Sequence, residues 1–417
     1  MSIVRFVVFI VVTLGLLGGL NLYVFRWARK AFGLQRRAQL AIKWVLWGSI
    51  AGMLLGRLAG RMWPGAVTTS VIAVSSTVAL ATIISGVMLL LADAALWLVG
   101  LVGRVRSSQQ LQAEPPLALA AELPVVVPAE LPRRTFLTQA AAGSAFLIGS
   151  SSSLYGALKG RQDYVIETVP LRIPGLARAL DGFSIVQLSD VHIGAYTGEA
   201  ELNAAFELVR QAKPDLVVLT GDLLDNDPRF AAQLGRFVRR LSPLAREGVV
   251  AISGNHDYFA GVEEMAHAIV GGGAHILQND ARIIGTKEAG FALLGVDDVW
   301  ARREGGGPDL ERALRALPKL GGRVAPALDL PRVLLCHNPS YFAEAAGQVA
   351  LQLSGHTHGG QINLGIRPAD YLLPGGWVAG RYDQDGSILY VNRGFGTVGP
   401  PARLGSPPEV TRIVLSA

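Results

Sequence analysis

The stretch Phe183-Ser-Ile-Val-Gln-Leu-Ser-Asp-Val-His192 decides the fold, because it joins a short apolar strand to two side chains that can bind a metal ion. Similar apolar segments alternate with amphipathic helices from about Asp181 onward, and this alternation predicts a layered α/β domain. We expect helices at Leu202–Ala212, Phe230–Arg246 and Asp309–Leu317. The expected strands are Phe183–Leu188, Leu216–Thr220, Val249–Ser253, Phe291–Gly295, Val333–Cys336, Ala350–Ser354, Ile388–Asn392 and Val410–Leu415.

Polar side chains of the kinds that bind metals follow five of these strands. In open α/β sheets, ligands bind in the crevice beyond the carboxyl ends of the strands, so we expect these side chains to lie close together at one sheet edge. Five of the chain's seven histidines fall within the five motifs. The motifs are Asp190-Val191-His192, Gly221-Asp222-Leu223-Leu224-Asp225, Gly254-Asn255-His256-Asp257, His337 and Gly355-His356-Thr357-His358-Gly359-Gly360.

Each motif taken alone has an ordinary structural explanation. A Gly-Asp pair after a strand is commonly a turn, and Gly254 and Asn255 suit a tight turn with positive φ. The alternation of His356 and His358 is more specific, because alternate residues can face the same side. Packing alone does not explain five such motifs in succession, each at the end of a strand, so we favour a binding site.

Together these motifs resemble the calcineurin-like metallophosphoesterase superfamily, and the resemblance runs from about Phe183 to the C-terminus. All five blocks are present without a missing ligand. The tail, with Asn392-Arg393-Gly394-Phe395-Gly396-Thr397 and Pro407-Pro408-Glu409-Val410, resembles the membrane-tethered YkuE-like branch. The resemblance implies an αββα sandwich of four layers, in which two β-sheets are flanked by helices.

The resemblance also implies a centre of two metal ions. Asp222 would bridge the ions, because its carboxylate offers two charged oxygens, and Asn255 would add a neutral oxygen. A hydroxide shared by the two ions would attack the phosphorus in line. His256, oriented by Asp225, would either protonate the leaving oxygen or stabilise the developing charge. Oxygen and imidazole ligands without a thiolate suit Mn, Fe or Zn. One ion would be held by Asp190, His192, Asp222 and His358, and the other by Asp222, Asn255, His337 and His356.

Several other polar residues are expected to be structural. Asp257 has two interpretations, since it would either assist the site or complete a turn. Arg393 and Arg403 are expected on the surface, with contact to a substrate phosphate as the alternative. We expect an exposed helical His267, a His275 in a loop or at a strand edge, and a Cys336 that behaves as a small buried hydrophobe.

The first 106 residues are predicted to form three transmembrane helices. Phe6–Phe25 is an almost unbroken apolar run of about 20 residues, the length that spans a bilayer. Trp44–Gly60 is a second run, with Arg57 near its end. We interpret Ala66–Gly103 as one transmembrane helix that continues past Asp93 into an interfacial segment. Buried helices of a soluble core are the alternative, but such helices rarely run so far without a polar face.

Basic residues predict the orientation of these helices. Six arginines and lysines lie between the first two runs, and Arg104 and Arg106 follow the third, so both positions are predicted to be cytoplasmic. Residues 107–132 are predicted to be a cytoplasmic linker. Within 133–160, the pair Arg133-Arg134 before a mildly apolar stretch is typical either of a twin-arginine export signal or of a fourth membrane helix. Both interpretations place residues 161–417 outside the cytoplasmic membrane.

The excess of positive charge belongs to the N-terminal part of the chain. Residues up to Arg161 include 15 basic and 4 acidic side chains, and the remainder includes 23 and 28. Nucleic-acid binding needs a basic face, so we expect no nucleic-acid partner for the second part. The sequence makes no prediction of the oligomeric state.

The sequence therefore favours a membrane-anchored phosphohydrolase that acts on a phosphoester, preferably a phosphodiester, outside the cytoplasm. A substrate linked to lipid suits a position beside the bilayer. Cleavage of a nucleotide-diacylsugar pyrophosphate is an alternative, but nucleotide-linked precursors are cytoplasmic. A receptor or transporter would need charges inside the membrane, and the helices offer only Arg57 and Asp93. A catalytically inactive binding module would be expected to lack ligands.

Overall fold

The computed structural model describes residues 3–63, 65–110, 133–286, 289–321 and 330–417. The chain divides into two compact units, Met1–Leu154 and Tyr155–Ala417. The first unit consists of helices and the second contains both sheets.

The first unit contains three helices that are long and apolar enough to cross a membrane. Helix α3 is continuous past Asp93, and it includes residues 107–110 of the predicted linker. The rest of that linker, residues 111–132, lies outside the described residues. The helices are α1 (Ile3–Phe32), α2 (Arg36–Met62), α3 (Ala66–Gln110) and α4 (Arg133–Leu158), and the three apolar spans are Val11–Phe32, Arg36–Gly60 and Ala66–Val99.

Polar and small side chains join the apolar helices of this unit. Asp93 on α3 accepts hydrogen bonds from Tyr23 Oη at 2.6 Å and Trp27 Nε1 at 3.0 Å, both on α1. If this part of α3 lies in a bilayer, the Asp93 carboxylate needs such donors. Gly56 on α2 lies so close to α3 that an added Cβ would come within 2.7 Å of the Ile72 side chain. Small residues permit this close approach of two membrane helices.

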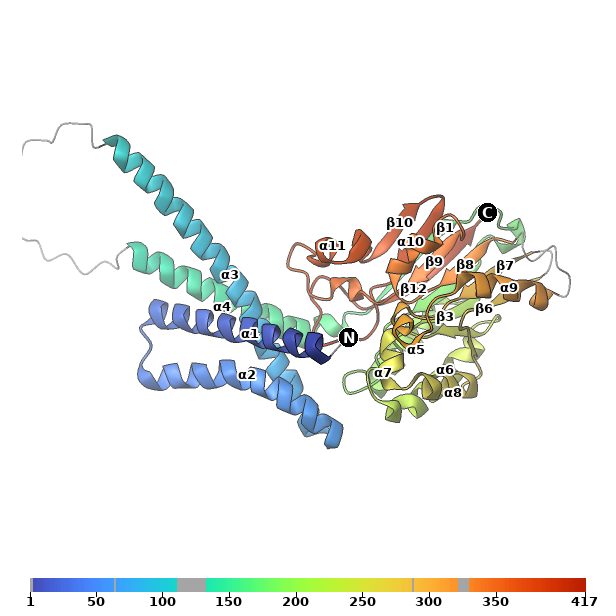
Figure 1. The fold of residues 1–417 in the computed structure, drawn as a ribbon, viewed down its shortest axis with the longest axis horizontal. Coiled ribbons are helices and arrows are strands. Elements are labelled where there is room, and N and C mark those ends of the chain that lie inside the picture. The colour runs from blue at the N-terminus through green and yellow to red at the C-terminus, as the bar shows by residue number, and fades with distance from the viewer. Residues whose placement is uncertain (1–2, 64, 111–132, 287–288, 322–329) are drawn as a thin grey trace, which may run out of the picture. The chain divides into compact units, whose positions relative to one another are not determined.

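The second unit is built on two mixed sheets of six strands each (Figure 1). Strands β2, β3, β4 and β5 pair in parallel, and β12 joins them antiparallel. In the other sheet, β7, β8, β9 and β11 are parallel and the two outer strands are antiparallel. In spatial order the first sheet is β1 (Val165–Arg172), β12 (Glu409–Ser416), β2 (Ser184–Leu188), β3 (Leu216–Thr220), β4 (Val249–Ile252) and β5 (His275–Ile276). The second is β10 (Gly380–Gln384), β11 (Ser387–Val391), β9 (Leu351–Ser354), β8 (Arg332–Leu335), β7 (Gly290–Gly295) and β6 (Asp280–Gly285).

Alternating side chains on these strands divide the described interior of this unit into four hydrophobic cores. Val217 and Leu219 of β3 pack against helices on the outer face of the first sheet, whereas Leu216 and Val218 pack between the sheets. A strand that is buried on both faces has a continuous apolar sequence and not an alternating one. Helices α5 (Glu199–Ala212), α6 (Ala231–Leu241) and α8 (Val262–Gly271) cover the first sheet, and α9 (Leu310–Gly321) covers the second. The predicted αββα order of layers is therefore confirmed.

The predicted elements of this unit agree with the observed ones except at sheet edges, at helix ends and in three short helices that were not predicted, α7 (Asn255–Ala260), α10 (Phe342–Ala345) and α11 (Ala369–Leu372). Helix α9 continues to Gly321, four residues past the predicted end at Leu317. Helix α6 ends at Leu241, not at Arg246, because Pro243 follows in a 3-10 turn and a proline inside a helix lacks the N–H needed for the ladder. Four strands, β1, β5, β6 and β10, were not predicted. Each lies at the end of its sheet, where half-exposed side chains weaken the apolar pattern.

The core between the sheets predicts a large penalty for truncation. Phe291 is fully buried there and its ring meets that of Phe183 edge-on, with centroids 5.5 Å apart. We expect Phe291→Ala to lower the free energy of unfolding by about 3–5 kcal/mol. Urea denaturation of the detergent-solubilised chain, followed by pulse proteolysis, measures this change. Val270→Ala, at an apolar but 59% exposed position, should change stability by less than about 0.5 kcal/mol. Equal effects of the two substitutions would contradict the assignment of this core.

Candidate metal centre

The five polar motifs meet at one place, but they come from two sheets and not from one. Strands β2, β3 and β4 of the first sheet lead into the first three motifs, and β8 and β9 of the second lead into the last two. Backbone contacts join the two groups: the amide of His356 donates to both carboxylate oxygens of Asp190, each at 3.0 Å. The prediction that the motifs converge holds, although the crevice lies where two sheet edges meet.

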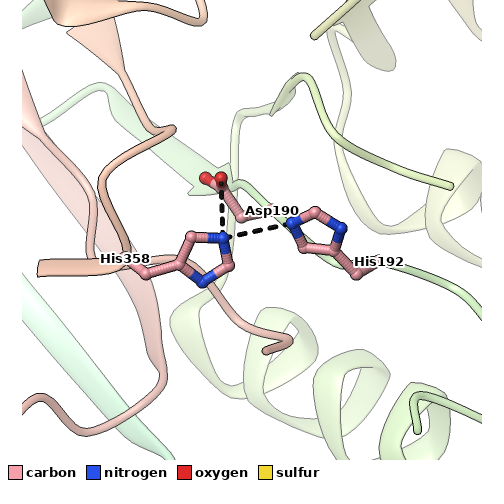
Figure 2. A group of neighbouring side chains, drawn as sticks. All are labelled: Asp190, His192 and His358. Carbon is pink, nitrogen blue, oxygen red and sulfur yellow. Dashed lines mark hydrogen bonds and ion pairs between the residues drawn. The ribbon is translucent and has the colours of Figure 1, made fainter. Parts of the chain in front are cut away.

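Asp190, His192 and His358 form the first cluster, in which all three side chains are buried (Figure 2). Nε2 of His358 lies 3.3 Å from Oδ1 of Asp190 and 3.1 Å from Nε2 of His192. Figure 2 shows the three groups turned toward one point. Two ring nitrogens this close can share only one hydrogen, so the arrangement suits a cation that accepts both lone pairs.

Asp222, His337 and His356 form the second cluster. Nε2 of His337 lies 3.2 Å from Oδ2 of Asp222 and 3.3 Å from Nδ1 of His356. Nδ1 of His337 lies 2.8 Å from the carbonyl oxygen of Thr220, which orients the ring so that Nε2 faces the cluster. The same Oδ2 of Asp222 lies 3.7 Å from Nε2 of His192. Asp222 therefore borders both clusters.

The donor atoms of the two clusters fit divalent metal ions. Oδ1 of Asn255 is buried and has no hydrogen-bond partner among the described residues, although buried polar atoms are normally satisfied. An oxygen in this state beside carboxylates and imidazoles suits a metal ion, since hard oxygen and imidazole nitrogen are its usual ligands. The structure thus brings together six of the seven residues predicted to bind metal: Asp190, His192, Asp222, His337, His356 and His358. The seventh, Asn255, lies between Gly254 and His256, which both contact Asp222.

Burial and neighbouring charge shift the pKa values in the two clusters. Burial lowers the pKa of His356 to about 4 and that of His358 well below its usual value. Burial would raise the pKa of Asp222, but His337 and His192 outweigh it and hold that pKa well below its usual range. Neutral imidazole and ionised carboxylate are the forms that bind metals. Asp222 in turn raises the pKa of His337, against the effect of burial, because an anion here attracts a positive charge.

The loops that carry the ligands have unusual backbone conformations. Nine non-glycine residues in the described part of the chain have positive φ, and five of them are predicted ligands. Gly254 provides the close approach that these loops need, because an added Cβ would lie 2.3 Å from Oδ1 of Asp222. Strained backbone of this kind is found at functional sites that the surrounding fold holds in place. The five ligands are Asp190, His192, Asp222, His356 and His358.

His256 forms a third group of possible ligand atoms with His192 and Asp222, and Asp225 contacts its ring through two groups. Nδ1 of His256 is 2.8 Å from the backbone carbonyl oxygen of Asp225 and 3.6 Å from its carboxylate. That carboxylate is also 3.6 Å from Nδ1 of His192. Burial would lower the pKa of His256, but the hydrogen bond to Asp225 and the charge of Asp222 raise it to about 9. The predicted pairing of His256 with Asp225 is present, and its shorter contact is to the backbone.

Asp257 holds the loops together. Its fully buried carboxylate accepts hydrogen bonds from the amides of Leu223, Leu224 and Gly254, each at 2.9 Å. These amides flank Asp222 and Asn255 in the sequence. Of the two interpretations of Asp257, the structure therefore supports a turn-forming role, and that turn positions ligands.

Arg403 contradicts the prediction of a surface arginine. It is buried, and its guanidinium donates to the carbonyl oxygens of Arg393, Gly394, Gly396 and Ser406. Its Nη2 also lies 3.2 Å from Nδ1 of His358, so it supports the ring of a predicted ligand. The glycines of the 394–396 segment were the one sequence signal that the backbone folds tightly here.

The remaining polar residues have the predicted environments, apart from Arg393. Arg393 is half-buried and pairs with Glu409 and with Glu167, the latter at 2.9 Å. His267 is exposed on α8, and His275 is exposed on the edge strand β5. Cys336 is fully buried in the core under α9.

Comparison with known proteins agrees with this geometry. A family model described as calcineurin-like phosphoesterase matches residues 183–360. YkuE of Bacillus subtilis, described as an uncharacterized metallophosphoesterase, is 30% identical over 63% of this chain and 90% of its own length. The phosphodiesterase YaeI of Escherichia coli is 30% identical over 68% of this chain and 98% of its own. A transmembrane protein with metallophosphoesterase domain from Danio rerio is 32% identical over 65% of this chain. That match covers 62% of the fish protein, less than two thirds.

The contacts of Asp257 predict a loss of stability when its charge is removed. We expect Asp257→Asn to lower the free energy of unfolding by about 1–3 kcal/mol, because an amide NH₂ would replace one acceptor of backbone N–H groups. Urea unfolding in the presence of a chelator measures this without a contribution from metal. Asp385→Asn is the matched control, since Asp385 is exposed in a turn with positive φ, which asparagine tolerates. An Asp257→Asn chain with unchanged stability would show that these hydrogen bonds do not hold the loops.

Proposed function

This chain belongs to the calcineurin-like metallophosphoesterase family, and on that premise we propose that it is a membrane-anchored hydrolase that cleaves a phosphodiester bond outside the cytoplasm. The observation that carries the proposal is the buried Asp222 carboxylate between two clusters of metal-binding side chains. The Escherichia coli relative is described as a phosphodiesterase, which favours a diester over a monoester or pyrophosphate.

We propose that the site binds two metal ions, drawn from Mn, Fe and Zn. When bound, such ions polarise a phosphoryl group and lower the pKa of a water that attacks it. Asp222 would contribute to both sites because it borders both clusters. Asn255 would be a ligand because its buried oxygen has no partner among the described residues. Asp190, His192 and His358 complete one site, and His337 and His356 complete the other.

His256 is the proposed general acid. The Asp225 carbonyl accepts the hydrogen on Nδ1 of His256, so Nε2 is the nitrogen that is left to face a substrate. With both nitrogens protonated, Nε2–H would donate its proton to the oxygen that leaves the phosphorus. The Asp225 carboxylate, 3.6 Å from the ring, would stabilise the positive charge of His256 until that transfer.

The proposed setting is the outer face of the cytoplasmic membrane. Three helices are long and apolar enough to span a bilayer, and the basic residues between the first two predict a cytoplasmic loop. This topology disfavours a nucleotide-linked substrate and favours a phosphoester of the envelope, including one that is linked to lipid. The proposed ligand set is complete, which disfavours a receptor that has lost catalysis.

Substitutions that separate metal binding from proton transfer test this proposal. We expect His256→Ala to keep its metal content and to lower kcat for bis(4-nitrophenyl) phosphate by about 10²–10⁴-fold, the usual effect of losing a general acid. Asp222→Asn should lose both metal and activity. The assay uses the full chain in detergent with Mn, Fe or Zn, with metal content measured by mass spectrometry.

The control for these variants is His267→Ala, which removes an exposed histidine on α8 and should leave kcat unchanged. A His256→Ala chain that loses its metals would contradict the assigned role. A metal-loaded chain that hydrolyses no diester, monoester or lipid phosphate would overturn the proposed activity.

The orientation of the catalytic unit has a separate test. Alkaline phosphatase fused after Ala417 is active only outside the cytoplasm, so we expect an active fusion. The matched control is green fluorescent protein fused after Ala417. Its fluorescence should be weak if the fusion is exported in an unfolded state. An inactive phosphatase together with a bright fluorescent fusion would place the unit in the cytoplasm and would restore the nucleotide-linked substrate.

A further inference from the structure

Exposed apolar side chains of the second unit are concentrated in one short segment, residues 364–373. Nine large apolar side chains are exposed in the described residues after 154, and five of them lie in these ten positions. Tyr371 is 85% exposed, Leu372 79% and Ile366 69%. Side chains this exposed do not pack on their own domain, and such a concentration is typical of an interaction site. The five residues of this apolar segment are Leu364, Ile366, Tyr371, Leu372 and Leu373.

The apolar segment is anchored directly to the loop that carries a predicted ligand. Nδ2 of Asn363 donates to the carbonyl oxygen of Gly359 at 2.9 Å, one residue after His358. Gly360 packs against Arg367 and Ala369 so closely that an added Cβ would lie 3.2 Å from the Arg367 side chain. The segment therefore projects from the rim of the metal centre.

A cleft of about 670 Å³ is lined by Gly365, Ile366 and Arg367 of the apolar segment and by residues of both sheets. Its lining carries both signs of charge, with Arg367, Arg381 and Arg393 on one hand and Glu167 and Glu409 on the other. Arg367 also pairs with Asp370 at 2.7 Å, so the segment itself has no net charge. Exposed apolar side chains beside a cleft that carries both signs of charge suit the boundary between acyl chains and zwitterionic headgroups.

The residues just before the apolar segment lie beside the point where the chain enters this unit. The amide of Arg403 donates to the carbonyl oxygen of Gly156 at 3.1 Å, at the end of α4. The next residue, Leu404, exchanges backbone hydrogen bonds with Gln361 and Asn363, at 2.9 and 2.8 Å. The chain runs into this unit from helices that are long and apolar enough to cross a membrane. This covalent connection keeps a bilayer near this part of the unit, so a bilayer is the surface that it would contact most often.

We propose that the apolar segment, residues 364–373, is a membrane-contacting surface that inserts Ile366, Tyr371 and Leu372 into the headgroup boundary of a phospholipid bilayer. Tyrosine and aliphatic side chains are suited to this boundary, where one part of the ring is apolar and its hydroxyl stays hydrated. A second copy of this chain is the competing occupant. Docking of this kind would present a substrate in the bilayer to the metal centre, and this consequence alone rests on the proposed function.

A fluorescent label on the apolar segment tests the contact in the full chain. The only native cysteine, Cys336, is fully buried, so a thiol-reactive fluorophore would label Leu372→Cys selectively. The labelled chain is reconstituted into vesicles of phosphatidylcholine with a minor share of phosphatidylglycerol. We expect phosphatidylcholine with a doxyl group high on its acyl chain to quench Leu372→Cys about fivefold more than Val270→Cys, because inserted residues lie about 5–10 Å below the surface.

The outcomes distinguish the bilayer from other occupants. Val270→Cys is the matched control, since Val270 is an exposed apolar residue on α8, and aqueous iodide should quench it more than it quenches Leu372→Cys. Equal quenching of both positions by iodide would overturn the proposal. A label at 372 that neither quencher reaches would indicate cover by protein and would also overturn it. Adding Asp222→Asn should leave the lipid quenching unchanged, so failure of catalysis and failure of docking are read separately.

Discussion

The arrangement of the second unit's polar loops depends on one buried carboxylate, Asp222, whose negative charge needs a nearby positive charge. Asp222 lies at the end of β3, in reach of His192 on one side and His337 on the other. Its second oxygen accepts the backbone amide of His256 at 2.7 Å. An ionised carboxyl group in the interior is costly unless it is paired or binds a metal. The close approach at Gly254 and the hydrogen bonds to Asp257 fix the loops around Asp222, so they hold its partners in place.

The sequence predicted the parts of the fold that follow from local hydrophobic pattern. It did not predict those that rest on pairing or hydrogen bonding with the backbone of residues elsewhere in the chain. Strands such as β3 are buried on both faces and followed by polar motifs, so their position and their convergence could be predicted. Edge strand β1 alternates between exposed and half-buried residues and pairs only with β12, and its pattern is correspondingly weak. The role of Arg403 could not be predicted, because its partners are carbonyl oxygens that no residue type identifies. Asp225 was predicted to orient His256, but the sequence did not indicate that the shorter contact is to the Asp225 carbonyl oxygen.

The apolar side chains in the two units follow different physical rules. In the helical unit, exposed residues such as Trp44 and Leu55 are expected wherever lipid replaces water as the solvent. In the described part of the second unit, apolar residues are buried in four cores, and the apolar segment at 364–373 is a local departure from that rule. The apolar segment lies at the rim of the metal centre and beside the point where the chain enters this unit. It is therefore placed to contact lipid from a domain that is otherwise built for water.

The division of the ligands between two sheets has a consequence for a shortened chain. Asp190 and His192 are 166 residues from the His356 and His358 that complete their surroundings, and Arg403 comes later still. The motifs that follow β2, β3 and β4 bring His192, Asp222 and His256 together by themselves. The motifs that follow β8 and β9 add His337, His356 and His358, and Arg403 contacts the ring of His358. A chain that stopped before Arg403 would therefore lack both the guanidinium that supports His358 and the strand β12 that joins β1 to β2.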